Sequence, residues 1–180
     1  MVDTTKVKHD LDKYFKTTGT VKIDPFTGVV DVDGDVVLKR GNTKKLPVKF
    51  GTVSGYFYCY GKNLVSLSGS PRHVGGDFDC YDNQLTSLEG APNHVGDVFR
   101  CVYNPLTSLE GAPDHVHMFS CSYSKLLPVL RLIAYPYVTL LGSPSEVEDI
   151  IIKYAGQGKP GALRAAAELI RAGYKENARW

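Results

Sequence analysis

The sequence predicts an α/β repeat, a short solenoid of stacked turns with helical segments at both ends. Three features support this fold class: a cysteine that recurs about every 21 residues, a phenylalanine two residues before it, and the stretch LTSLEGAP at 85–92 and 106–113. The recurring pairs are Phe57 and Cys59, Phe78 and Cys80, Phe99 and Cys101, and Phe119 and Cys121. In such repeats each turn buries its apolar face against its neighbours.

The composition is that of an ordinary globular protein. Of 180 residues, 43% are hydrophobic and 22% charged, and the net charge of +2 does not indicate a dedicated nucleic-acid binder. The segment Met1 to Lys16 is polar, and the longest apolar stretch, Leu126 to Leu141, is interrupted by Pro128, Arg131 and Pro136. We therefore expect a cytoplasmic protein whose cysteines are reduced thiols.

Residues 1–32 are predicted to form an N-terminal cap made of a helix and a hairpin. Apolar residues stand at helical spacing within 3–15, and Gly19 follows the helix. Residues 20–33 then read as a β-hairpin, with strands near 21–23 and 29–32 around a turn at 24–28. Together these elements are expected to cover the first turn of the solenoid.

Residues 33–126 are predicted to be the solenoid, in which each turn reads Phe-x-Cys-x-x-Asn-x-Leu-x-x-Leu. Phe and Cys lie two residues apart, so both point to one face of a short strand, which we expect to be the buried face of a parallel sheet. Asn83 and Asn104 are expected to bond unpaired backbone groups of adjacent turns. Lys62 and Ser124 stand where Asn is expected, so the Asn series is predicted to be interrupted there.

A weaker copy of the repeat precedes these turns. Val36 and Leu38 fit the Phe and Cys positions, and Leu46 fits the second Leu. With the decaying copy at 117–126, the sequence predicts about five turns, of which the outer two are degenerate.

The repeat resembles the leucine-rich-repeat family, whose core is Leu-x-x-Leu-x-Leu-x-x-Asn-x-Leu, with Phe and Cys in two of the Leu positions. It is most similar to short leucine-rich-repeat proteins of tailed bacteriophages and some bacteria, through LTSLEGAP, the lead-in VDVDGDV at 30–36 and the tail KYAGQGKPGALRAAAELIRAGYKENARW. The resemblance implies a leucine-rich-repeat solenoid. It also implies a phage accessory protein that binds and modulates a host or defence protein in the host cytoplasm.

Residues 127–180 are predicted to form a C-terminal cap with two helices, although a small docking module is an alternative. Ser145 and Glu148 read as a capping box. The first helix places on one face the residues Val147, Ile150, Ile151 and Tyr154. The second helix, at about 161–172, is expected to bury Leu163, Ala166, Ala167 and Ile170, with Gly173 at its end.

Positions that alternate with the buried ones are expected to form a concave face that binds a protein. Tyr, Arg and Met on a rigid surface are typical interface anchors. The predicted partner-binding residues are Tyr56, Tyr58, Tyr60, Asp77, Asp79, Tyr81, Arg100, Val102, Tyr103, Met118 and Tyr123. A solvated sheet without a partner is one alternative. Another is a nucleotide or nucleic-acid binder that uses Tyr stacking with Arg100 and the stretch Lys39, Arg40, Lys44 and Lys45.

Other chemistry finds less support in the sequence. The cysteines replace Leu and lack close C-x-x-C pairs, so we expect buried hydrophobes and no metal. His73, His94 and His115 recur in Pro-x-His-Val; stacked, they could bind an anion or a metal ion, or they could be repeated turn residues. The Gly-rich stretch 156–161 is expected to be an interhelical turn rather than a phosphate loop. No catalytic constellation stands out, so neither an enzyme nor a cofactor is expected.

Overall fold

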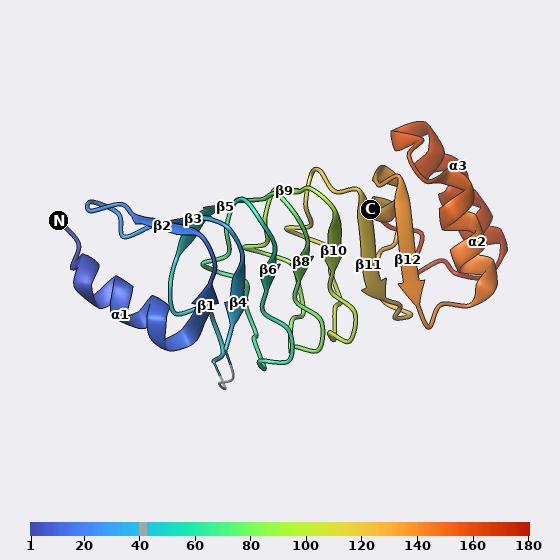
Figure 1. The fold of residues 1–180 in the computed structure, drawn as a ribbon. Helices are drawn as coiled ribbons and strands as arrows, with labels where there is room; N and C mark the ends of the chain where they lie inside the picture. The colour runs from blue at the N-terminus through green and yellow to red at the C-terminus, as the bar shows by residue number, and fades with distance from the viewer. Residues whose placement is uncertain (40–42) are drawn as a thin grey trace.

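The chain folds into a repeat solenoid whose wall consists of two sheets (Figure 1). The structure, a computed structural model, describes residues 1–39 and 43–180. One sheet has seven strands in the spatial order β1 (Phe15–Thr17), β4 (Val36–Leu38), β6 (Phe57–Tyr58), β8 (Phe78–Asp79), β10 (Val98–Arg100), β11 (Met118–Ser122) and β12 (Tyr137–Leu141). The other has five, in the order β2 (Thr20–Ile23), β3 (Val30–Asp33), β5 (Phe50–Val53), β7 (His73–Val74) and β9 (His94–Val95).

The strand pairing follows the repeat predicted from the sequence. Pairing is parallel except for β1 with β4 and β2 with β3, and Phe57, Phe78, Phe99 and Phe119 stand in register. The weaker first copy is confirmed as well, because Val36 pairs with Phe57 and Leu38 is buried. A repeat solenoid of parallel strands is therefore the fold of the central chain.

The five-stranded sheet was not anticipated beyond its hairpin. The alternative that the Pro-x-His-Val histidines are repeated turn residues is wrong for His73 and His94, which pair with each other as strand residues; His94 also forms a parallel bridge with His115. Their neighbours Val74 and Val95 are fully or almost fully buried. Two central turns thus each contribute a second, two-residue strand, β7 and β9, because a valine after each histidine fills the opposite side of the core.

Aromatic rings form a continuous stack along the core. Consecutive phenylalanines from Phe57 to Phe119 lie nearly parallel, with ring centroids 5.5, 5.3 and 5.2 Å apart. Tyr135 continues the stack 4.8 Å from Phe119, and its hydroxyl donates to the carbonyl of Pro113. This arrangement favours aromatic dispersion contacts in every turn.

The cysteines form a second buried column, as predicted. All four are free thiols with no exposed surface. Burial raises the pKa of each thiol, in Cys121 to about 12. A neutral, inaccessible thiol behaves as a small hydrophobe and offers no thiolate for redox chemistry or metal binding.

The buried asparagines close the backbone between turns. The side-chain oxygen of Asn83 accepts from the backbone N–H groups of Lys62 and Leu64, both at 3.0 Å. Its amide nitrogen donates to the carbonyls of Cys59 at 3.0 Å and Cys80 at 2.9 Å. Asn104 repeats this pattern one turn later, which confirms the bonding predicted for both residues.

The N-terminal segment contains the elements expected there. Helix α1 (Thr4–Tyr14) starts at Asp3, whose side chain accepts from the N–H of Lys6, and β2 and β3 form the hairpin. Leu11 and Phe15 enter the core, where the Phe15 ring meets that of Phe50 edge-on at 5.0 Å. The apolar side of α1 is therefore anchored in the first turn.

The C-terminal segment adds η1 (Leu130–Ala134), β12, α2 (Ser145–Tyr154) and α3 (Gly158–Arg171). The four apolar residues predicted to share one face of α2 are all buried, as expected. The predicted capping box is wrong, because Pro144 is the N-cap and no side chain bonds the helix start. The strand β12 lies in the apolar stretch that the sequence left unassigned, and it extends the seven-stranded sheet beside β11.

The buried face of α3 also differs from the prediction. Its buried residues are Gly161, Ala162, Ala165 and Leu169. Leu163 and Ile170, expected inside, are 75% and 55% exposed. The cause is close packing: a Cβ on Gly161 would lie 3.1 Å from the carbonyl oxygen of Tyr154, so the small residues face α2 and η1 and rotate the larger ones outward.

The C-terminal tail packs onto the last loop of the solenoid. Asn177 is 2% exposed, and its amide nitrogen donates to the carbonyls of Ser124 at 3.0 Å and Leu127 at 2.9 Å. The backbone carbonyl of Asn177 accepts from the N–H of Val129. In the turn where Ser124 stands in place of the expected Asn, the distant Asn177 therefore donates the hydrogen bonds to the backbone carbonyls.

Candidate functional site

The outer face of the seven-stranded sheet carries the residues predicted to bind a partner. Residues on either side of each buried Phe and Cys point away from the core, because side chains alternate along a strand. Across the sheet, Tyr58 of β6 stands beside Asp79 of β8, which stands beside Arg100 of β10. The site is therefore a surface built by successive turns, with each strand supplying equivalent positions.

Four tyrosines on this face form one patch, which we call the tyrosine patch: Tyr56, Tyr58, Tyr60 and Tyr81. The rings of Tyr56 and Tyr58 stack at 4.2 Å, and those of Tyr60 and Tyr81 at 4.9 Å. Tyr58 and Tyr60 join the two stacks with centroids 6.1 Å apart. Mutual stacking holds the rings in place, so little side-chain entropy remains to be lost on binding.

Carboxylates border the tyrosine patch on its β8 side. Asp79 is only 5% exposed and pairs with the guanidinium of Arg100 at 2.7 Å. Asp77 accepts from the backbone N–H of Val98. Burial, followed by the negative charges of Asp77 and Asp79, raises the pKa of the Tyr58 hydroxyl, so this side of the patch is electronegative and the phenol stays protonated.

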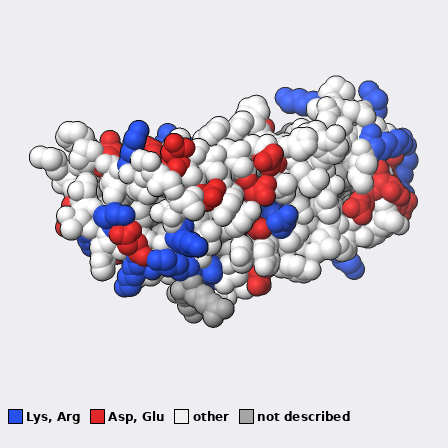
Figure 2. Space-filling view, in the orientation of Figure 1, with Lys and Arg blue, Asp and Glu red and all other residues white. Residues whose placement is uncertain are grey.

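The middle of this face is mostly uncharged in Figure 2, which has the orientation of Figure 1. Acidic and basic side chains interrupt the uncharged surface in places, and most Lys and Arg lie toward the two ends of the molecule. An uncharged, aromatic centre with polar groups around it is the usual composition of a protein interface.

Three residues of the predicted binding face are not freely exposed on it. Asp79 and Val102 are buried, at 5% and 9% exposure, so they pack beneath the surface and present little area to a partner. The hydroxyl of Tyr123 donates to Asn177 of the tail at 2.9 Å, which engages this tyrosine within the molecule. Met118 is half-buried and pairs in register with Val98 and Tyr137, which extends the face toward β12.

Tyr103 has an unusual backbone conformation for its size. Its φ is 57°, in the left-handed region, and its side chain is 63% exposed. The equivalent residues of the two preceding turns are Gly61 and Asp82, with φ of 62° and 55°. The turn therefore imposes this conformation, and a left-handed L-residue in it costs about 1–2 kcal/mol.

The basic residues invoked for nucleic-acid binding are dispersed or engaged. Arg40 lies outside the described residues. The ammonium of Lys39 donates to the backbone carbonyl of Asp12 at the end of α1, while Lys44 and Lys45 are exposed. Arg100 is held by Asp79, whereas the ammonium of Lys62 lies 5.9 Å from the centroid of the Tyr60 ring, so one cation borders the tyrosine patch.

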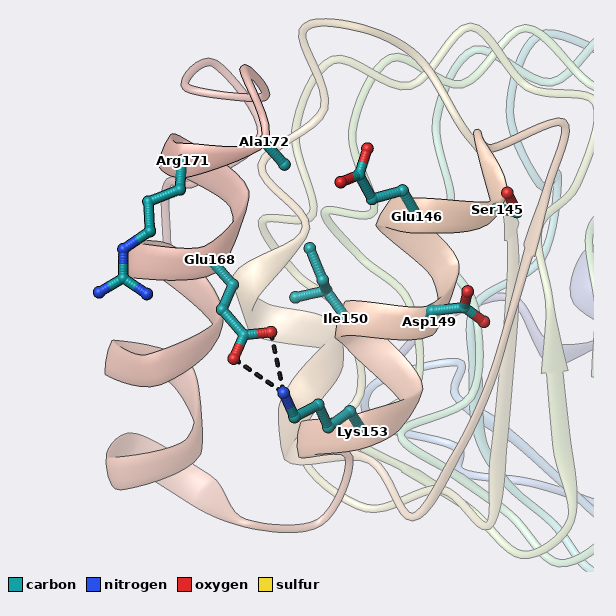
Figure 3. A pocket seen from close by; sticks show the side chains of 8 residues that line it. All are labelled: Ser145, Glu146, Asp149, Ile150, Lys153, Glu168, Arg171 and Ala172. Carbon is teal, nitrogen blue, oxygen red and sulfur yellow. Dashed lines mark hydrogen bonds and ion pairs between the residues drawn. The ribbon is translucent and has the colours of Figure 1, made fainter.

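A separate hollow of about 540 Å³ opens between α2 and α3 (Figure 3). Lys153 bridges the helices by binding both carboxylate oxygens of Glu168, at 2.8 and 3.1 Å, and Tyr154 donates to the same carboxylate at 2.6 Å. These bonds raise the pKa of Lys153 and lower that of Glu168. These groups tie the two helices together. The prediction that the Gly-rich stretch 156–161 is an interhelical turn is wrong for most of it, because Gly156 and Gln157 lie between the helices and Gly158–Gly161 form the first turn of α3.

Across residues 1–39 and 43–180, no group of three or more His, Cys, Asp or Glu side chains is arranged to hold a metal ion. In the same part of the chain, no helix has the length and apolar character needed to cross a bilayer.

Comparisons with protein-family models, with curated proteins and with solved structures found no match to this chain.

Proposed function

We propose that the chain is a non-catalytic protein-binding module that uses the outer face of its seven-stranded sheet. The observation that carries this proposal is the tyrosine patch, four rings stacked across neighbouring strands on a rigid surface. Tyrosine provides a large contact area with few rotatable bonds, so it is enriched among residues that dominate binding energy.

The solenoid belongs, in this proposal, to the leucine-rich-repeat class, with helical segments as caps. Two features support this assignment. The leucines of the Leu-x-x-Leu units, such as Leu85 and Leu88, are buried, and so are the asparagines Asn83 and Asn104. Open repeats need covered ends. Phe15 at one end and Tyr135 at the other extend the aromatic core and are consistent with that role.

A protein partner is favoured over a nucleotide or nucleic acid. Two pairs of tyrosine rings already stack on each other, which leaves fewer ring faces for bases. Asp77 and Asp79 border the patch, and carboxylates repel phosphate. The phage-like sequence features suggest that the partner is a host or defence protein in the bacterial cytoplasm; this step rests on the resemblance alone.

The decisive experiment compares two triple variants in partner capture. The protein is immobilised, bacterial proteins that it retains are identified, and the Kd of each is measured with purified partner. The variant Tyr58→Ala, Tyr60→Ala, Tyr81→Ala should weaken the true partner by at least about 100-fold, since interface tyrosines often contribute 1–2 kcal/mol each. Circular dichroism and urea unfolding check that the fold is retained.

The matched control removes exposed apolar side chains of the C-terminal helices, through Ile152→Ala, Leu163→Ala and Ile170→Ala. This variant should bind the partner with unchanged Kd. A loss of binding in the control alone would place the interface on α2 and α3 and overturn the proposal. Binding of a nucleic acid by the wild type, with a Kd that rises steeply between low and moderate salt, would instead support the alternative function.

A further inference from the structure

Two carboxylates flank Tyr56 on the outer face of the seven-stranded sheet. Asp35, Tyr56 and Asp77 each precede a buried residue, and those buried residues pair in register across β4, β6 and β8. The three residues therefore stand in one row, with about 4.8 Å between neighbouring strands. All three are half-buried, so aromatic surface and acidic groups lie side by side along this row.

The carboxylates of this row keep their negative charge. Among the described residues, neither Asp35 nor Asp77 takes part in an ion pair. One oxygen of Asp77 accepts from the backbone N–H of Val98 at 3.1 Å, and no donor of the described chain bonds its other oxygen. Burial and then the charge of Asp77 raise the pKa of the Tyr58 hydroxyl, so this charge acts on the second ring of the stack as well.

Two cations of the chain itself show which contacts this face can make. The guanidinium of Arg100 bonds the carboxylate of Asp79 at 2.7 Å. The ammonium of Lys62 lies 5.9 Å from the centroid of the Tyr60 ring, a distance at which a cation is attracted by the ring. In the described chain, the row of Asp35, Tyr56 and Asp77 has neither kind of cation beside it.

We propose that the partner presents an arginine to this row, with its guanidinium stacked on Tyr56 and bonded to Asp77, an inference that rests on the proposed function. Tyr58 is the one ring of the described chain that stacks on Tyr56, so the second face of Tyr56 is not covered by another ring. A guanidinium is planar, so it stacks on an aromatic ring and bonds a carboxylate at the same time. The ammonium of lysine is a strongly hydrated point charge and does not stack.

The first test uses acetyl-arginine amide as the probe and follows the tyrosine ring signals of the full-length protein by nuclear magnetic resonance. Acetyl-citrulline amide has nearly the same shape without the charge, and it should bind at least about 10-fold more weakly, since the charge-assisted bond and the cation–π contact are both lost. Acetyl-lysine amide keeps the charge but cannot stack, and it should bind about 3-fold more weakly than the arginine probe.

The second test changes the protein. Asp77→Asn keeps an oxygen for the N–H of Val98 but removes the charge, so it should weaken the arginine probe at least about 5-fold. Tyr56→Leu should weaken the probe by a similar factor, whereas Tyr56→Phe, which keeps the ring, should bind it like the wild type. The matched control Glu89→Gln removes one carboxylate from an exposed turn and should leave the Kd unchanged. Circular dichroism checks that each variant is folded.

Equal affinity for the arginine and citrulline probes would overturn the inference, and this comparison needs no variant. So would equal affinity of the arginine probe for the wild type and for Asp77→Asn. A captured partner that is lost with the triple tyrosine variant, yet binds Asp77→Asn with the wild-type Kd, would uphold the protein interface and overturn the arginine contact. A partner that binds the triple tyrosine variant unchanged, while the arginine probe binds the wild type as expected, would support the arginine site and overturn the proposed function.

Discussion

The central turns and the last loop of the solenoid solve the same hydrogen-bonding problem with residues from different parts of the chain. In the central turns the amide that closes each turn belongs to the repeat itself, at Asn83 and Asn104. Around Ser124 the amide comes from Asn177, in the tail. Buried carbonyls need donors wherever they occur, so a missing residue in one repeat predicts a donor elsewhere without identifying it.

The two regions differ also in their thiols. A column of buried cysteines runs from Cys59 to Cys121, whereas the helical segments at the ends contain none. Any condition that ionises thiols therefore acts on the solenoid and spares the ends.

The largest expected effect is alkaline unfolding of the solenoid. Burial raises the pKa of all four thiols, so above about pH 9 the unfolded chain loses thiol protons that the folded chain keeps. The contribution of the buried, neutral thiols to the free energy of unfolding is complete below pH 9. Above pH 9 it falls by about 1.4 kcal/mol for each thiol and each pH unit. With four thiols, urea unfolding should show a steep loss between pH 9 and 11.

A matched control for the pH experiment is Cys101→Ala, which removes one thiol from the column. The dependence of the unfolding free energy on pH above 9 should become shallower by about one quarter. A free energy of unfolding that stays constant from pH 8 to 10 would contradict the thiol explanation.

The next largest effect is expected for Asn83→Ala in the central turns. The substitution leaves buried N–H groups of Lys62 and Leu64 and the carbonyls of Cys59 and Cys80 without their partner. We expect a loss of about 3–5 kcal/mol, measured by urea unfolding at pH 7. Asn93→Ala, at an exposed turn position, should change stability by less than about 0.5 kcal/mol.

The corresponding change at the end, Asn177→Ala, should have a smaller effect. The tail retains backbone bonds to Val129 and Leu130, and water reaches the last loop more easily, so we expect a loss of about 1–3 kcal/mol. Trypsin should cleave the tail faster while the central turns stay protected. A loss as large as that of Asn83→Ala would mean that the tail and the central turns unfold as one unit.

Much of the fold could be predicted because the repeat is strict where burial is complete. Phe78, Cys80 and Asn83 occupy positions at which size and hydrogen bonding leave few alternatives. The second sheet escaped prediction because strands as short as His73–Val74 contain too few residues to show alternation. The buried side of α3 escaped because glycine and alanine, which permit close helix packing, carry little weight in a hydrophobic pattern.

The outer face was predictable only in part. Alternation along the strands placed the tyrosine patch correctly on one surface. The burial of Val102 and the bond between Tyr123 and Asn177 depend on neighbours that no repeat specifies. A usable signal for Tyr103 was present, since it aligns with Gly61 and Asp82, residue types that favour turns with positive φ.

Paired residues of neighbouring turns are separated by the same number of residues in both sheets, and this equality determines how such a chain can change length. Phe57 pairs with Phe78 in one sheet and His73 with His94 in the other, each 21 residues apart. After insertion or removal of one whole repeat, the strands of both sheets could pair again in register. The contacts between equivalent core residues of neighbouring turns would be kept. A single added residue would turn buried side chains toward solvent. The outer surface can therefore be extended one turn at a time, and each added turn supplies new solvent-facing positions while the core stays the same.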